Sequence, residues 1–136
     1  MLRALLLTVA LFLAAAPLPA EARGRNELNR RGCTAGTSAD RAQLIARHAW
    51  QKHGKEFSAG KRIAGVLYPA PGISSESELA EMVARILDGK GEEIANGRSK
   101  YWDDATGTIV IFNSRARACG TVFRPNQGRR YYDRQR

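Results

Sequence analysis

Histidine, cysteine and long apolar runs are all scarce in this chain of 136 residues. The longest apolar run covers the thirteen residues 4–16, whereas a helix that spans a bilayer needs about 20. The chain has two histidines and two cysteines, and no Cys, His and Asp residues have the spacing of a zinc site. No glycine-rich nucleotide-binding motif and no internal repeat is present. We therefore predict no bound metal, no cofactor and no stable membrane insertion.

The first 22 residues have the pattern of a secretory signal peptide. Arg3 precedes the apolar run, and a small-x-small cleavage site ends at Ala22. We expect cleavage near Ala22 and a secreted or periplasmic location, with an uncleaved anchor as the lesser alternative. Residues 23–36 are rich in Arg, Asn and Gly and are predicted to form an irregular arm. Residues 37–136 are then long enough for a single domain with one modest core.

The two cysteines, Cys33 and Cys119, fit an exported chain. In an oxidising compartment an even number of cysteines indicates a disulfide, which here would tie the arm to the C-terminal part of the domain. The alternative is two separate buried thiols.

Positive charge is concentrated at the two ends of the mature chain. The formal net charge is +9, of which residues 23–53 contribute +5 and residues 98–136 contribute +6, while residues 54–97 carry −2. If the two ends meet in the fold, they form one cationic face for a polyanion. A basic surface that only keeps the protein soluble is the alternative.

Two helices are predicted in the first half of the domain. Residues 37–40, Thr-Ser-Ala-Asp, match the capping-box pattern and predict a helix to about His53, with Gly54 as its stop. Residues 75–78, Ser-Glu-Ser-Glu, begin a second helix, whose apolar stripe ends at Asp88 and Gly89. The residues between them are predicted to form a long loop.

The second half of the domain has the pattern of short strands separated by turns. The fold class that follows is α+β, with two N-terminal helices packed on a small three- to four-stranded antiparallel sheet. A helical turn is expected at residues 92–96, and the strands are expected at residues 100–102, 108–112 and 121–124, with a fourth at Tyr131 and Tyr132.

Five segments together carry a resemblance to a known family. They are HAWQKH at 48–53, GR at 97–98, YWDD at 101–104, TGTIVI at 106–111 and GTVFRP at 120–125. In order and spacing they resemble the C-terminal ribonuclease toxin domains of bacterial polymorphic toxins, of the contact-dependent inhibition and Rhs type, and among them the barnase/EndoU/colicin/RelE-like ribonucleases. The resemblance covers about residues 44–132. It implies two N-terminal helices on a four-stranded antiparallel sheet, and RNA cleavage that does not depend on a metal.

Such cleavage needs groups that exchange protons with the 2′-OH and with the leaving 5′-oxygen. His53, at a helix C-terminus that favours a protonated ring, is the first candidate. His48 is the second, and its alternative is a semi-buried structural histidine beside Leu44 and Ile45. The two rings are five residues apart, so on a regular helix they point about 140° apart. They cannot easily bind one metal ion, and they cannot both face one substrate unless the helix ends before His53.

The phosphorane also needs cationic and hydroxyl donors, and Arg98, Thr121 and Arg124 are the candidates. Thr121 and Arg124 lie on opposite faces of their predicted strand, so a bulge or the turn at Pro125 must re-aim Arg124. Further side chains are candidates for substrate binding, although aromatic residues at strand spacing are more often part of a core. These candidates are Lys52, Tyr101, Trp102, Thr108, Arg129, Arg130 and Tyr131.

The sequence thus favours an exported, metal-independent ribonuclease toxin or effector that attacks RNA through its 2′-OH. The expected partners are RNA, with tRNA and rRNA as candidate substrates, and an acidic immunity or inhibitor protein; the chain is expected to be a monomer. The alternative is a non-enzymatic, disulfide-stapled basic module that binds nucleic acid, an anionic envelope polymer or an acidic protein. A cationic membrane-active peptide is a weaker possibility, because neither helix combines a basic face with a large aromatic apolar face.

Overall fold

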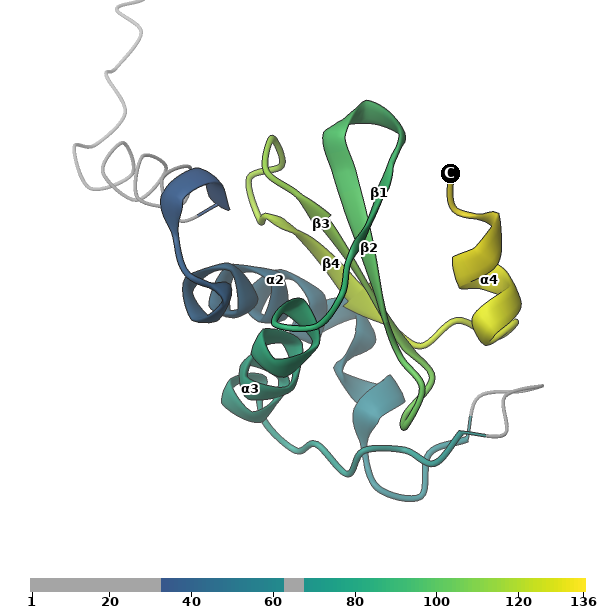
Figure 1. Cartoon of the computed structure of the whole chain (residues 1–136). Coiled ribbons are helices and arrows are strands. Elements are labelled where there is room, and N and C mark those ends of the chain that lie inside the picture. The colour runs from purple at the N-terminus through teal and green to yellow at the C-terminus, as the bar shows by residue number, and fades with distance from the viewer. Residues whose placement is uncertain (1–32, 63–67) are drawn as a thin grey trace, which may run out of the picture.

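A computed structural model of the chain describes residues 33–62 and 68–136 (Figure 1). The predicted signal peptide and residues 23–32 of the predicted arm lie outside the described residues. The last part of that arm differs from the prediction, because residues 33–35 are helical. Within the two described ranges, no helix is both long enough and apolar enough to cross a membrane.

Helix α2 (Ser38–His53) begins and ends where the sequence predicts. The Thr37 hydroxyl accepts a hydrogen bond from the Asp40 backbone N–H at 3.2 Å, and the Asp40 carboxylate accepts one from the Thr37 backbone N–H at 2.8 Å. This reciprocal pair is the capping box that satisfies the free donors of the first turn. These hydrogen bonds hold the pKa of the Asp40 carboxyl below its usual value.

Helix α3 (Glu76–Leu87) is also confirmed, and it supplies much of the core. Ser75 caps its N-terminus, and Leu79, Met82 and Val83 are buried on one side of the helix. They pack with Ile45 of α2 and with the apolar side chains of the sheet in one cluster. The second helix forms because its apolar residues recur at helical spacing and its first turn is capped.

The sheet has four antiparallel strands in the order β1-β2-β3-β4. Three of them lie close to the predicted ranges. The segment at residues 92–96 was expected to form a helical turn, and this expectation was wrong: it begins with strand β1 and continues into the short 3₁₀ helix η2 (Ala95–Gly97). The strands are β1 (Glu92–Ile94), β2 (Arg98–Asp103), β3 (Thr108–Asn113) and β4 (Gly120–Phe123).

The second correction concerns the C-terminus. Tyr131 and Tyr132 were expected in a fourth strand, but they belong to a helix, α4 (Arg129–Arg134). The α+β class with a small antiparallel sheet is therefore confirmed, while the helices are not confined to the N-terminal half. In Figure 1, α4 lies on the opposite side of the sheet from α2 and α3.

Side chains alternate between these two sides of the sheet. Tyr101, Val110 and Val122 lie side by side across β2, β3 and β4, and all three join the core beneath α2 and α3. The next residue on each strand belongs to a neighbouring row that faces the α4 side. This row consists of Trp102, Ile109 and Phe123.

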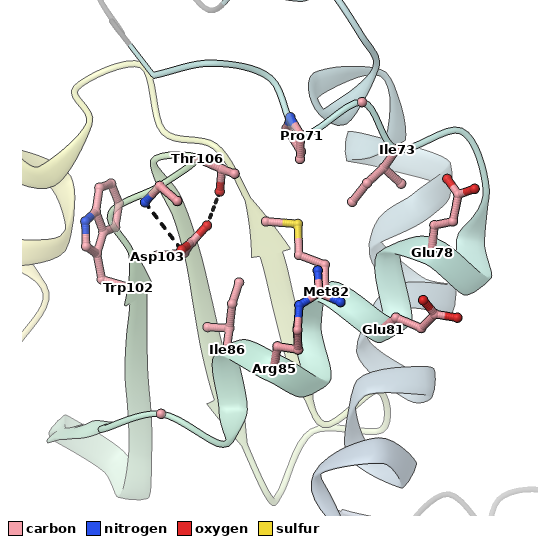
Figure 2. A pocket seen from close by; sticks show the side chains of 13 residues that line it. Pro71, Ile73, Glu78, Glu81, Met82, Arg85, Ile86, Trp102, Asp103 and Thr106 are labelled. Atoms are coloured by element: carbon pink, nitrogen blue, oxygen red, sulfur yellow. Dashed lines mark hydrogen bonds between the residues drawn. The ribbon is translucent and has the colours of Figure 1, made fainter.

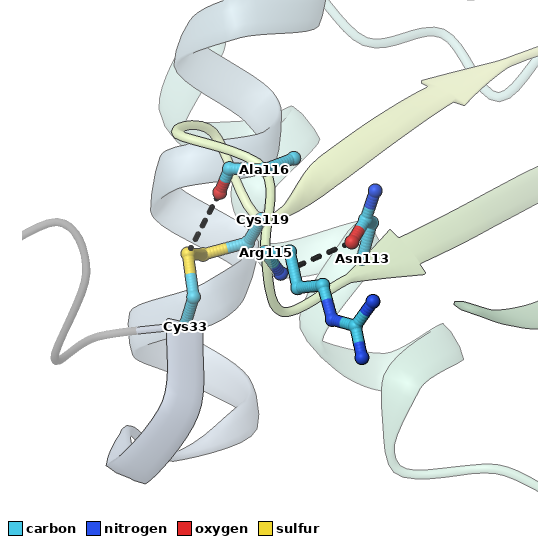
Figure 3. The surroundings of a disulfide bond; sticks show 5 residues. All are labelled: Cys33, Asn113, Arg115, Ala116 and Cys119. Carbon is cyan, nitrogen blue, oxygen red and sulfur yellow. Dashed lines mark hydrogen bonds between the residues drawn. A yellow bond between two sulfur atoms is a disulfide. The ribbon is translucent and has the colours of Figure 1, made fainter. Parts of the chain in front are cut away.

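A disulfide joins Cys33 to Cys119, as predicted. Both cysteines are completely buried, and the bond links chain positions 86 residues apart (Figure 3). Cys119 ends the loop between β3 and β4, so the disulfide fixes the start of β4. The next residue must be glycine: Gly120 has φ +136°, and an added Cβ would lie 1.9 Å from the Ile111 carbonyl oxygen.

Candidate functional site

His53 is the last residue of α2, and its ring is paired with a carboxylate. Its Nδ1 lies 2.7 Å from Oε1 of Glu56, in the 3₁₀ helix η1 (Gly54–Phe57) that follows. The side chains of His53 and Glu56 are 31% and 29% exposed, so both are shielded from solvent but accessible to a ligand. A carboxylate only accepts hydrogen bonds, so Nδ1 carries the proton and Nε2 is left to exchange one with a ligand.

The tight turn that brings Glu56 back to His53 depends on Gly54. Gly54 is buried and packs against the indole of Trp50, where a Cβ would lie 2.8 Å from the ring atom Cε3. Its φ of −52° is an ordinary helical value, so the requirement for glycine comes from this close approach and not from the backbone angle. The chain can therefore pass directly from α2 into η1, and positions 53 and 56 lie one turn apart.

The second oxygen of the same carboxylate is bound to the sheet. Glu56 Oε2 accepts a hydrogen bond from the backbone N–H of Arg124 at 2.9 Å, immediately after β4. Glu56 thus bridges the His53 ring and the end of β4. This bridge fixes the orientation of the imidazole, because a carboxylate held at both oxygens cannot turn freely.

Two aromatic rings extend the site from His53 to α4. The Phe123 ring centroid lies 5.6 Å from that of His53, and the Tyr131 ring meets Phe123 edge-on at 5.4 Å. Thr121 lies two residues before Phe123 on β4 and therefore on the same face of the sheet. All four residues are partly accessible. From the predicted set, the structure thus brings His53 and Tyr131 together through Phe123 and places Thr121 on the same face of the sheet as Phe123.

Arg124 is placed differently from what the sequence led us to expect. It is 2% exposed, and within the described residues all hydrogen bonds of its guanidinium go to backbone carbonyls. Burial lowers the pKa of this guanidinium, and the nearby charge of Glu56 partly opposes that change. Its donors are therefore already used, and none of them is directed at a ligand beside His53. The acceptors are the carbonyl oxygens of Thr106, Glu56, Lys61, Tyr68 and Pro69, at 2.7 to 3.5 Å.

Arg98 and His48 also lie away from this group. Arg98 begins β2 opposite Asn113, at the end of the sheet remote from Phe123, and its Nε donates to the Ala95 carbonyl at 3.1 Å. His48 is exposed on α2, so it is not the semi-buried histidine of the structural alternative. The site at His53 therefore contains one histidine.

The predicted binding residues are spread over several parts of the molecule. Lys52 and Arg130 are exposed, whereas Thr108 is buried and Tyr101 packs toward the core. Arg129 forms ion pairs with acidic side chains and lies over two aromatic rings, so most of its capacity for contacts is used within the protein. Its contacts are Asp133 at 3.1 Å, Asp104 at 3.6 Å, and the rings of Tyr132 and Trp102 at 4.5 and 5.8 Å from their centroids.

A separate cavity of about 590 Å³ lies between α3 and the turn that joins β2 to β3 (Figure 2). Trp102 and Arg85 contribute to its wall, but two of its carboxylates are bound within the protein. Asp103 accepts hydrogen bonds from the Thr106 hydroxyl and the Ala105 N–H, and Glu78 accepts them from Ser74. The cavity contains no histidine. Of these two candidate sites in the described residues, the group at His53 is therefore the one that contains an imidazole.

Within residues 33–62 and 68–136, no group of three or more His, Cys, Asp or Glu side chains could hold a metal ion. Comparison of the chain with protein-family models, with curated proteins and with solved structures found no match.

Sequence reasoning missed two residues of this site, Glu56 and Phe123. A His-x-x-Glu spacing is a local signal that points to a pair of side chains one helical turn apart. The signal is masked because Gly54 predicts the end of the helix, which places Glu56 in the loop that follows. Phe123 had no comparable signal, since its contact with His53 depends on how α2 packs against β4.

Proposed function

We propose that this protein is an exported ribonuclease toxin or effector that cleaves RNA without a metal, with His53 as the proton-transferring residue. The observation that carries the proposal is the pairing of His53 Nδ1 with Glu56 at 2.7 Å, in a ring that lies beside Phe123 and whose Nε2 has no hydrogen-bond partner among the described residues. A half-accessible imidazole, oriented by a carboxylate, is the arrangement that general acid–base catalysis uses near neutral pH.

In the proposed reaction the 2′-oxygen attacks the adjacent phosphorus, and the bond from phosphorus to the 5′-oxygen breaks. One proton leaves the 2′-OH and one is added to the departing 5′-oxygen, which gives a 2′,3′-cyclic phosphate and a free 5′-OH. His53 transfers one of these protons. The hydroxyls of Thr121 and Tyr131 donate hydrogen bonds to the phosphate, while the Phe123 and Tyr131 rings provide a surface on which an unpaired base can stack.

The placement of the arginines favours the alternative of a basic module that binds RNA without cleaving it. Arg98 and Arg124 were expected to stabilise the phosphorane, yet Arg98 lies at the far end of the sheet, and the buried side chain of Arg124 donates to backbone carbonyls. If the protein is such a binding module, its affinity for RNA depends on surface cations and does not change when His53 gains or loses a proton.

A cleavage assay with matched histidine variants distinguishes the two functions. Purified mature protein is incubated with total RNA in the presence of a chelator, and the ends of the fragments are mapped. We expect 2′,3′-cyclic or 3′-phosphate ends, and we expect His53→Ala to reduce the rate by roughly 10²- to 10⁴-fold. His48→Ala is the matched control, because His48 is exposed on the same helix and lies outside the site.

Glu56→Gln tests whether the carboxylate positions the imidazole. The amide keeps the size of the side chain but favours the wrong tautomer, so we expect a loss of between about 10-fold and 10⁴-fold, the scale known for such partners. The pH dependence of the rate should change as well, which a purely structural role would not produce. Intact RNA with wild-type protein from pH 5 to 8, or equal activity in wild type and His53→Ala, would reject the ribonuclease.

The proposal also includes an exported location of the protein and an acidic partner protein that inhibits it.

A further inference from the structure

The turn after β4 and one side of α4 enclose a surface hollow of about 580 Å³. Arg130 and Arg134 lie four residues apart on α4, so their side chains leave the same side of the helix. All of the residues that line the hollow are exposed and have side chains that donate hydrogen bonds. The lining consists of Asn126, Gln127, Arg130 and Arg134.

These two arginines differ from their neighbour Arg129 in how their charge is used. Arg129 is paired with Asp104 and Asp133, whereas no ion pair in the described part of the chain involves Arg130 or Arg134. Two like charges one helical turn apart repel each other and destabilise a helix. An anion placed between them would remove that repulsion, so the hollow is better suited to an anion than to water alone.

The chemistry of the lining identifies the class of anion. A guanidinium presents planar, two-pronged donors that match the oxygens of a phosphate, and the carboxamides of Asn126 and Gln127 add neutral donors. Contacts of this kind hold the backbone of a nucleic acid and do not depend on its sequence. We propose that this hollow is a phosphodiester-binding subsite for the RNA strand, flanking the position that is cleaved.

The helix that carries the subsite is connected to His53 by ring contacts already described. Tyr131 follows Arg130 on α4, its ring meets Phe123, and Phe123 meets the His53 ring. An RNA strand held by a phosphate in the hollow would therefore pass the two aromatic rings before it reaches the imidazole. The statement that this subsite binds the RNA substrate rests on the proposed function. The affinity of the subsite for phosphate can nevertheless be measured without cleavage.

The test uses a fluorescent 2′-O-methyl oligoribonucleotide, which cannot be cleaved through its 2′-oxygen. Binding to the full mature protein is followed by anisotropy over a range of salt concentrations. For Arg130→Gln/Arg134→Gln we expect weaker binding and a salt slope reduced by roughly 1.4, because each phosphate contact to a single strand contributes about 0.7. The matched control is Arg47→Gln/Arg85→Gln, which removes the same charge from exposed positions on α2 and α3.

The outcomes separate this proposal from the ribonuclease. An unchanged slope in the α4 double variant, or the same change in the control, would overturn the subsite even if His53→Ala abolishes cleavage. A reduced slope that is specific to the α4 variant would support the subsite even if no RNA is cleaved, and the protein would then be the binding module. Thermal unfolding of all variants verifies that α4 remains folded.

Discussion

Arg124 shows how one residue can serve the fold where the sequence suggested chemistry. Among the described residues it has the largest fully buried side chain. Its guanidinium donates hydrogen bonds to carbonyls on both sides of the loop after α2. Its backbone N–H also binds Glu56, so Arg124 positions the partner of His53 through the main chain. No sequence pattern reveals this role. The acceptors are backbone atoms, and most of them lie more than 50 residues away from Arg124 in the sequence.

Arg124→Met should therefore reduce stability more than an ordinary surface change. Methionine fills much of the same volume but leaves several partly buried backbone carbonyls without this donor, so we expect a loss of about 2–4 kcal/mol in the free energy of unfolding. Denaturant unfolding measures this loss, and Arg117→Met, at an exposed position between β3 and β4, is the control. Equal stability of the two variants would contradict the buried role.

At the scale of elements, the helices α2 and α3 were predictable because their signals are local. A capping residue and apolar positions three and four apart lie within one segment, so the sequence alone indicates where each helix begins. Helix α4 has six residues, which is too short to be stable alone. The buried Lys100 holds it by donating to two carbonyls near its end, those of Tyr132 at 3.1 Å and Gln135 at 2.8 Å. These contacts override the strand preference of the two tyrosines.

The docking of α4 should weaken in alkaline solution. Burial, together with a hydrogen bond from the Tyr132 hydroxyl to Glu92, raises the pKa of Tyr132 above its ordinary value. A raised pKa means that the folded protein holds this proton more tightly than the unfolded chain. Its contribution to stability is therefore complete below about pH 10, the ordinary value for tyrosine, and is lost as the pH rises through the pKa of the folded state.

Tyr132→Phe provides the matched comparison. We expect the variant to be less stable than wild type at neutral pH, because it lacks the hydrogen bond to Glu92. Its stability should fall less steeply above about pH 10, since the titrating hydroxyl is gone. Denaturant unfolding at several pH values measures both effects. Parallel curves for the two proteins would show that Tyr132 does not contribute to the alkaline loss.

At the scale of the whole molecule, the sequence predicted the class of fold better than the site. The capping signals, the order of helices and strands and the two cysteines indicated a disulfide-bonded α+β domain, and the structure has the α+β class and the disulfide. Of the predicted catalytic residues in the described part of the chain, only His53 has a side chain that is both partly accessible and paired with a carboxylate. The guanidinium groups of Arg98 and Arg124 donate to backbone carbonyls, because their positions depend on strand register and loop path. Helix α2 and strand β4, which belong to the two basic ends, are in contact, and the arginines of α4 that form no ion pair in the described part of the chain are Arg130 and Arg134.

The disulfide gives the last prediction, since it ties the helical residues 33–35 to the start of β4. It closes a loop of 86 residues, and the chain-entropy model gives a stabilisation of about 4–5 kcal/mol for a loop of that length. Reduction, or a Cys33→Ser/Cys119→Ser variant, should lower the midpoint of denaturant unfolding by a corresponding amount. Because β4 carries Thr121 and Phe123 and ends beside Glu56, the His53 site should also lose order. We expect RNA cleavage to fall together with stability on reduction, and full activity in the reduced protein would show that the site forms without this bond.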